Sequence, residues 1–163
     1  MGARVLIISP HNDDALIGCF LYLTGRTSLF RLKFEEAENF ILFGSRMSKV
    51  ALEEAVKFAK DFGIEVLDGC RVEGGVDVVL SPSPESRHPE HRYWAWKSFD
   101  TNSKHRVFYS TDMSEWWVTP LRPEDAERKR ALLDAYFVPE SDLWRYDARY
   151  YLFEGYVGVL TYG

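Results

Sequence analysis

The sequence predicts an α/β fold: a single three-layer domain, residues 1–163, built around a Rossmann-like and mostly parallel sheet. Short aliphatic runs alternate along the chain with segments of helical periodicity, which is typical of parallel sheets with helices on both faces. The chain is 46% hydrophobic, so a substantial core is expected. Its 163 residues suit one domain, and no internal repeat or long linker divides them.

The first half of the chain supplies three expected strands. A strand buried on both faces of a parallel sheet is a nearly continuous apolar run, and two segments fit: 4–9 and 40–43. Residues 64–67 are expected to form a third strand. The apolar run 15–23 is too long for a typical strand and follows an Asp that can cap a helix, so it is expected to be helical. Residues 24–38 are expected to be a connector with one edge strand. The next helix begins after Ser45 or Ser48 and ends before Gly63.

In the second half of the chain, prolines mark the starts of the helices. Pro89 suits the first position of a helix that runs to about Phe99, with His88 as its N-cap. Pro123 begins a helix to Phe137 whose acidic residues precede its basic ones, as the helix dipole favours. Residues 81–86 are expected to form a loop, and the remaining strands are expected at 76–80, 106–110 and 150–160.

Composition and charge exclude several classes of protein. The net charge is −5, so the basic field that binds nucleic acid is missing. The longest apolar run, 15–23, is about half of what a membrane-spanning helix needs, and no export signal precedes the first strand. Cys19 and Cys70 lack CxxC spacing and are expected to be buried free thiols. The sequence therefore predicts a cytoplasmic protein that binds neither nucleic acid nor a membrane.

Aromatic residues make up 15% of the chain. Tyr93, Trp94 and Trp96 lie in an expected helix and are predicted to pack in the core, because small domains rely on large aromatic side chains for buried area. Trp116 and Trp117 are adjacent and point in opposite directions if the chain is extended. One of them is therefore a candidate for a substrate or subunit contact.

A first chemistry-bearing motif, PHNDD at 10–14, lies between the first strand and the first helix. Ligands of parallel sheets bind beyond the carboxyl ends of the strands, where such turns lie. Neighbouring side chains in a turn point apart, so one carboxylate can bind a metal while the other stays free. The alternative is that Asp13 or Asp14 only caps the helix and that His11 is an ordinary loop residue.

A second motif, HPEH at 88–91, follows the expected strand 76–80. His88 and His91 are about one helical turn apart, so both imidazoles can face one site. The alternative is a capping histidine with a surface histidine beside it. The two motifs together hold three of the four histidines, and the topology brings both to the same edge of the sheet.

Two histidines and one carboxylate with a free position are the ligand pattern of hydrolytic zinc. The same trio also suits non-haem iron. Iron oxygenases of the familiar kind have double-sheet β folds, and the alternation of strands and helices in this chain argues against them by analogy. Zinc is therefore the expected cofactor, with another divalent metal as the alternative.

The two motifs resemble PHPDDE and HPDH of the LmbE/PIG-L superfamily of zinc-dependent N-acetylglucosaminyl deacetylases. The resemblance extends, in order, over RVLIISPHNDD, EEAVKFAKDFGIEVL and VDVVLSPSPESRHPEHR. It implies that His11, Asp14 and His91 are zinc ligands and that Asp13 is the general base for the attacking water. It further implies that His88 steadies the tetrahedral oxyanion or protonates the leaving amine.

The sequence departs from the superfamily pattern at several positions, among them Phe20 and Leu21, which stand where members usually have a glycine pair. Asn12 replaces the proline of the first motif, Ala15 replaces its glutamate, and Ala51 stands where members often carry an arginine. Substrate contacts are therefore expected from other side chains, with three candidates: Arg46, Arg87 and Trp116. The chain is also short for the superfamily. A loop that covers the substrate is expected to be absent or to come from a second subunit, which leaves a homo-oligomer open.

The resemblance implies a zinc-dependent hydrolase that removes an N-acetyl group from an amino sugar or a related small amide. Two alternatives stay open. A catalytically idle relative that acts as a sugar-binding or assembly module would account for Asn12 and Ala15. An iron oxygenase would show dependence on oxygen.

Overall fold

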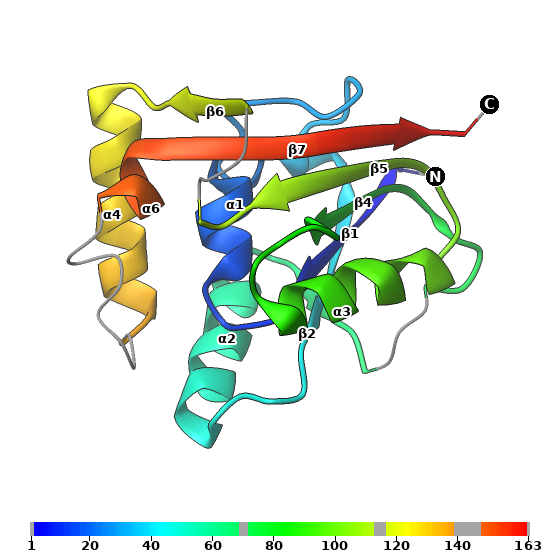
Figure 1. Ribbon diagram of the computed structural model, residues 1–163, viewed down its shortest axis with the longest axis horizontal. Helices are drawn as coiled ribbons and strands as arrows, with labels where there is room; N and C mark the ends of the chain where they lie inside the picture. The colour runs from blue at the N-terminus through cyan, green and yellow to red at the C-terminus, as the bar shows by residue number, and fades with distance from the viewer. Residues whose placement is uncertain (1, 69–71, 113–116, 139–147, 163) are drawn as a thin grey trace.

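The computed structural model of the chain describes residues 2–68, 72–112, 117–138 and 148–162. Seven strands form one sheet in the order β3-β2-β1-β4-β5-β7-β6 (Figure 1). The strands are β1 (Arg4–Ser9), β2 (Glu38–Phe43), β3 (Glu65–Val66), β4 (Val76–Pro82), β5 (Ser103–Ser110), β6 (Trp117–Pro120) and β7 (Phe153–Thr161). β1 to β5 pair in parallel, whereas β7 is antiparallel to both β5 and β6. The predicted α/β fold with a mostly parallel sheet is confirmed.

Helices cover both faces of the sheet. The described helices are α1 (Asp14–Leu23), α2 (Lys49–Asp61), α3 (Pro89–Lys97), α4 (Pro123–Tyr136) and α6 (Arg149–Leu152), with 3-10 turns η1 (Phe34–Glu36) and η2 (Ser98–Asp100). Alternate residues of β1 enter two separate cores. Val5 and Ile7 pack with α1, α2 and α4, whereas Leu6 and Ile8 lie on the α3 side, where Trp94 packs. Figure 1 shows α3 on the near face of the sheet and α1 on the far face.

Two helix starts follow the predicted capping chemistry. Ser48, one of the two predicted caps of α2, accepts a hydrogen bond from the backbone N–H of Ala51 at 3.1 Å. His88 caps α3 through Nδ1, which accepts from the backbone N–H of Glu90 at 3.2 Å. Each cap satisfies one of the N–H groups that have no partner within the first helical turn.

Three local predictions were wrong. The connector 24–38 holds no edge strand: Phe30 and Arg31 adopt positive φ in a tight turn, and η1 follows. The predicted loop 81–86 begins two residues later, because β4 continues through Pro82, which pairs with β5. Residues 150–152 belong to α6 instead of the final strand, and β6 was not predicted at all.

The predicted core position of the α3 aromatics was wrong for two of them. Tyr93 is 57% exposed and Trp96 is 65% exposed, whereas Trp94 is partly buried. The cause is helical phase, because His91 and Ala95, four residues apart, occupy the buried face of α3. Cys19 is a buried free thiol, as predicted. Cys70 lies outside the described residues.

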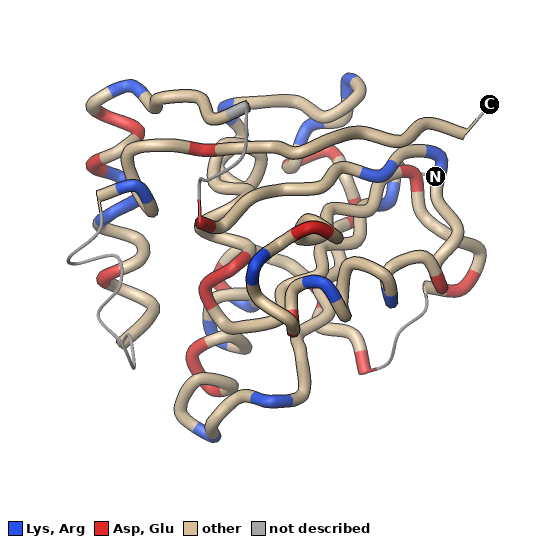
Figure 2. Tube along the Cα trace, viewed as in Figure 1, with Lys and Arg blue, Asp and Glu red and all other residues tan. Residues whose placement is uncertain are grey.

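Charged residues of both signs share the same elements of the fold. Figure 2 shows Lys and Arg interspersed with Asp and Glu along the trace, as in α4, where an acidic first turn precedes basic residues. Among the described helices, none combines the length and the apolar character that crossing a membrane requires.

Gly44, which directly follows β2, packs closely against the first motif. Its backbone N–H donates to the carbonyl of Ser9 at 3.1 Å, and a Cβ at this position would lie 2.3 Å from the carbonyl oxygen of Pro10. Gly44→Ala is therefore expected to lower the free energy of unfolding by about 1–3 kcal/mol, measured by denaturant titration. Gly158→Ala is the control, because no heavy atom lies within 4 Å of its added Cβ. Equal stability of the two variants would contradict the close packing.

Candidate metal centre

The two motifs meet at the carboxyl edge of adjacent strands. β1 and β4 pair in parallel, and each leads into the loop that carries one motif. Ser9, the last residue of β1, fixes the conformation of the loop that carries the first motif. Its Oγ donates to the carbonyl of His11 at 2.7 Å and accepts from the backbone N–H of Ala15 at 3.1 Å. The turn is thus fixed before its side chains reach the site.

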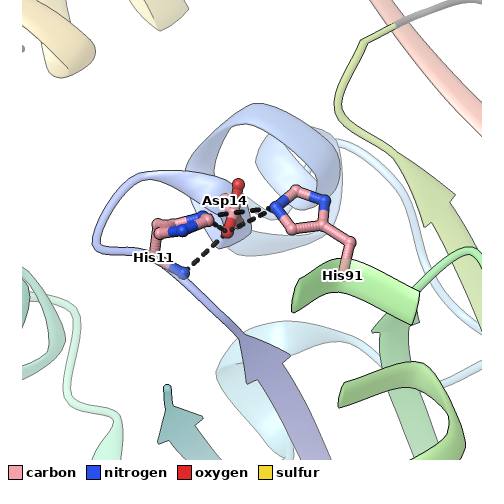
Figure 3. Close-up of side chains that lie close together, drawn as sticks. All are labelled: His11, Asp14 and His91. Carbon is pink, nitrogen blue, oxygen red and sulfur yellow. Dashed lines mark hydrogen bonds and ion pairs between the residues drawn. The ribbon is translucent and has the colours of Figure 1, made fainter. Parts of the chain in front are cut away.

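His11, Asp14 and His91 bring three potential metal ligands together (Figure 3). Oδ2 of Asp14 lies 3.1 Å from Nδ1 of His11 and 3.3 Å from Nε2 of His91, and the two nitrogens are 3.3 Å apart. The same carboxylate oxygen accepts the backbone N–H of His11 at 2.7 Å. Asp14 and His91 are each 4% exposed, so solvent does not compete strongly for these atoms.

This donor set fits a first-row divalent cation. In a tetrahedral site with metal–ligand distances of about 2.0–2.1 Å, neighbouring ligand atoms are about 3.3–3.4 Å apart. The three measured separations of 3.1–3.3 Å are close to that value. Two imidazole nitrogens and one carboxylate oxygen are also the donor types that zinc accepts. The chain can therefore hold a metal ion at this point.

Outer partners orient both imidazole rings. Nε2 of His11 lies 3.2 Å from Oε2 of Glu90, a buried atom with no hydrogen bond to any other described residue. Nδ1 of His91 lies 3.3 Å from Oγ1 of Thr111. If each ring gives its proton to the outer oxygen, Nδ1 of His11 and Nε2 of His91 keep free lone pairs toward the centre. Such outer contacts are general at metal-binding histidines.

The first motif contains two carboxylates in different electrostatic states. Burial disfavours a charged Asp14, but the charge of His91 and the hydrogen bonds from His11 and His91 outweigh it. The pKa of Asp14 therefore lies well below its ordinary value. Burial and the charge of Asp14 raise the pKa of Asp13 to about 7. The hydrogen bond to Asp14 raises the pKa of His11 to about 9. Asp13 is thus the easier of the two carboxylates to protonate.

His88 stands beside the donor set without joining it. Its ring centre lies 4.9 Å from that of His11 and 4.7 Å from that of His91. Because Nδ1 accepts the backbone N–H of Glu90, the proton of the neutral ring is on Nε2. Partial desolvation and the neighbouring charges of His91 and His11 lower the pKa of His88. The neutral ring can thus donate one hydrogen bond from a known atom.

A pocket of about 870 Å³ opens over the donor set. Arg46 and Arg87, both predicted as substrate contacts, are exposed and line it. Ala51, which the sequence resemblance alone compares with an arginine, lines it too. The third predicted contact, Trp116, lies outside the described residues. Asn12 and Asp13 complete the wall on the side of the first motif.

Two residues of the site were missed as site residues in the sequence. Glu54 of α2 lines the pocket, accepts Nδ2 of Asn12 at 3.4 Å and accepts the backbone N–H of Val138 at 2.6 Å. Thr111 directly follows β5 and contacts His91. The rule that placed the two motifs, carboxyl ends of parallel strands, also applies to Thr111. Glu54 carries no such signal, because its contact depends on how α2 packs.

Comparison with known proteins gives a likeness of structure. No model of a known protein family matches the sequence, and no curated protein is significantly similar to it. N,N'-diacetylchitobiose deacetylase from Pyrococcus horikoshii matches with a TM-score of 0.62 at 12% identity, over 98% of this chain and 84% of that one. The pseudoaglycone deacetylase Dbv21 matches with a TM-score of 0.54 at 12% identity, over 100% and 99%. The fold is that of these deacetylases.

The same fold also serves another reaction. GalB, the 4-carboxy-2-hydroxymuconate hydratase from Pseudomonas putida, matches with a TM-score of 0.56 at 13% identity, over 91% of this chain and 82% of that one. At such identities the likeness defines the fold and leaves the reaction open. The chemistry of this chain therefore has to be inferred from its own site residues.

The contact between Glu90 and His11 gives a direct prediction. Glu90→Ala is expected to weaken zinc or Co²⁺ affinity by roughly 10–100-fold, because the ring of His11 loses the partner that orients it. Glu90→Gln keeps an acceptor and is expected to lose less. Competition with a chelator measures both affinities. Glu85→Ala is the control, because Glu85 is an exposed residue of the loop before α3. A Glu90→Ala variant that binds as tightly as this control would contradict the role of Glu90.

Proposed function

We propose that the protein is a zinc-dependent amide hydrolase that removes an N-acetyl group from an amino sugar or a related small amide. The observation that carries this proposal is the convergence of the His11, Asp14 and His91 donor atoms. A second carboxylate and a third imidazole stand beside them in the same pocket. Amide hydrolysis needs a base for water, stabilisation of the oxyanion and a proton for the amine, and this set contains a group for each.

Each side chain has a distinct task in this proposal. His11, Asp14 and His91 would hold the zinc ion, which supplies Lewis acidity for the amide carbonyl and for water. The carboxylate of Asp13 takes a proton from the attacking water. Nε2–H of His88 donates a hydrogen bond to the carbonyl oxygen as negative charge develops there. The proton that Asp13 takes from water passes to the nitrogen as the C–N bond breaks.

Substrate binding is assigned to the rim of the pocket. The exposed guanidinium groups of Arg46 and Arg87 can donate to hydroxyl or anionic oxygens of a small substrate. Trp116 stays a proposed stacking contact. The name of N,N'-diacetylchitobiose deacetylase supports an N-acetylated sugar as the first substrate to try. The hydratase of the same fold makes direct measurement of amide cleavage necessary.

The test is release of acetate by the zinc-loaded protein from a panel of N-acetylated amino sugars and simple N-acetyl amides. We expect acetate and free amine in equal amounts, with release abolished by a chelator and restored by zinc. A protein that binds one equivalent of zinc and cleaves no member of the panel would contradict the hydrolase proposal. Calorimetry with the same sugars would then test the alternative of an idle sugar-binding relative.

A further inference from the structure

Helix α1, which begins at the proposed metal ligand Asp14, is interrupted in its middle. Cys19 has φ −127° and ψ 22°, outside the helical range. In a regular α-helix the backbone N–H of Leu21 would donate to the carbonyl of Ile17, four residues earlier. Here Leu21 N–H donates to Oε1 of Glu154 at 3.1 Å. The carbonyl of Ile17 accepts from Nζ of Lys129 at 2.6 Å. Two side chains thus take the place of one helical hydrogen bond.

The two side chains come from different elements and are deeply buried. Lys129 belongs to α4 and is 0% exposed, and Glu154 belongs to β7 and is 1% exposed. Lys129 also donates to the carbonyl of Phe153 at 3.0 Å, and Oε2 of Glu154 accepts the hydroxyl of Tyr156 at 2.9 Å. Burial lowers the pKa of Lys129 to about 8 and raises that of Glu154, and the charge of each opposes the shift of the other.

Fold stability alone does not explain a buried lysine and glutamate at this position. Two charges are costly to bury, and well-packed apolar side chains in their place are often equally or more stable. The charged pair instead fixes the position of α1, because each group forms a hydrogen bond with a particular backbone atom of this helix. The hydrogen bond of Lys129 to Ile17 is also linked to the site, because the backbone N–H of Ile17 donates to the carbonyl of Asp13 at 2.9 Å.

We propose that Lys129 and Glu154 are positioning residues, which hold the two halves of α1 apart so that its first turn presents Asp13 and Asp14 to the pocket. This inference rests on the metal site of the proposed function. Ile17 itself lines that pocket, so the turn held by Lys129 is also a part of its wall.

The test compares two double variants with the parent protein through Co²⁺ binding and the visible spectrum of the bound Co²⁺. Lys129→Met with Glu154→Met removes both side-chain hydrogen bonds to the backbone of α1 and leaves no buried charge unpaired. Lys129→Met with Glu154→Gln keeps an acceptor for Leu21. We expect the first to bind Co²⁺ about 10–100-fold more weakly with an altered spectrum, as when outer partners of a metal site are lost. We expect the second to recover part of the affinity.

The control is Arg26→Met, which breaks a different link between α4 and the end of α1, the ion pair of Arg26 with Asp125 at 3.1 Å. It is expected to change stability while the Co²⁺ affinity and spectrum stay as in the parent. Folded double variants that bind Co²⁺ like the parent would overturn the positioning role. A parent that binds no Co²⁺ would overturn both this inference and the proposed function.

If neither double variant folds, Tyr156→Phe provides the same test with both charges kept. It removes only the hydroxyl that donates to Glu154. A measurable loss of Co²⁺ affinity, about twofold or more, is expected, since the carboxylate of Glu154 loses one of its anchors. Parent-like affinity in this variant would overturn the proposal.

Discussion

Replacing Asp13 by asparagine is expected to lower kcat for amide cleavage by about 10²–10⁴-fold while zinc stays bound. Asparagine keeps the size and polarity of the side chain, but it cannot take a proton from water. Zinc is expected to remain because the donor group consists of His11, Asp14 and His91, and Asp13 is not part of it. Kinetics with the best substrate of the acetamide panel, together with metal analysis of the same preparation, measure both quantities.

The matched control is Asp112→Asn, because Asp112 is another carboxylate that lines the same pocket. Its kcat is expected to stay within a few-fold of the parent. An Asp13→Asn variant with parent-like kcat would contradict the general-base assignment. Loss of zinc from the Asp13→Asn variant would instead show that Asp13 is part of the metal site.

Replacing Asp14 by asparagine is expected to have the opposite signature, with loss of the metal first and of activity as a consequence. Oδ2 of Asp14 lies at 3.1 and 3.3 Å from the two imidazole nitrogens and provides the negative charge among the three donors. Zinc affinity is expected to fall by more than the roughly 10–100-fold that loss of an outer partner costs. Chelator competition monitors the affinity, and circular dichroism checks that the variant is folded.

The response of turnover to excess zinc distinguishes the Asp14→Asn variant from the Asp13→Asn variant. The Asp14→Asn variant is expected to regain part of its turnover when zinc is raised, because its base, Asp13, is intact. The Asp13→Asn variant is expected to regain none. The same response of both variants to zinc would contradict the division of labour between the two carboxylates.

The part of the site that the sequence predicted is the part that follows from short-range rules. PHNDD and HPEH each follow an aliphatic strand, and parallel strands bring their carboxyl ends to one edge. That reasoning brings the two motifs together, whereas the choice of His11, Asp14 and His91 within them came from the family resemblance. The structure brings the donor atoms of these three residues within 4.8 Å of one another. The caps at Ser48 and His88 also depend on local chemistry alone.

The parts that the sequence did not predict depend on contacts distant in the chain. Residues 150–152 look like a strand by composition, but the carbonyl of Leu152 accepts the N–H of Leu121 and the segment is helical. β6 is short, and among the described strands it pairs with β7 alone. Trp96 is large and apolar, yet the phase of α3, set by the buried His91 and Ala95, turns it to solvent.

The residues around the donor set also have contacts that depend on parts of the chain distant in the sequence. Glu90 belongs to the HPEH motif that the sequence analysis identified. Its contact with His11 was not predicted, because it depends on the conformation of the loop after β1. The two groups that split α1 come from α4 and β7, over 100 residues from the helix they hold. No pattern within the sequence of α1 predicts its contacts with these two side chains.

The most direct measurement is a crystal structure of the zinc-soaked protein with anomalous diffraction recorded on both sides of the zinc absorption edge. The zinc assignment predicts one strong anomalous peak, about 2.0–2.2 Å from Nδ1 of His11, Oδ2 of Asp14 and Nε2 of His91. An anomalous map without a peak among these three atoms, whether zinc binds elsewhere or nowhere, would contradict it.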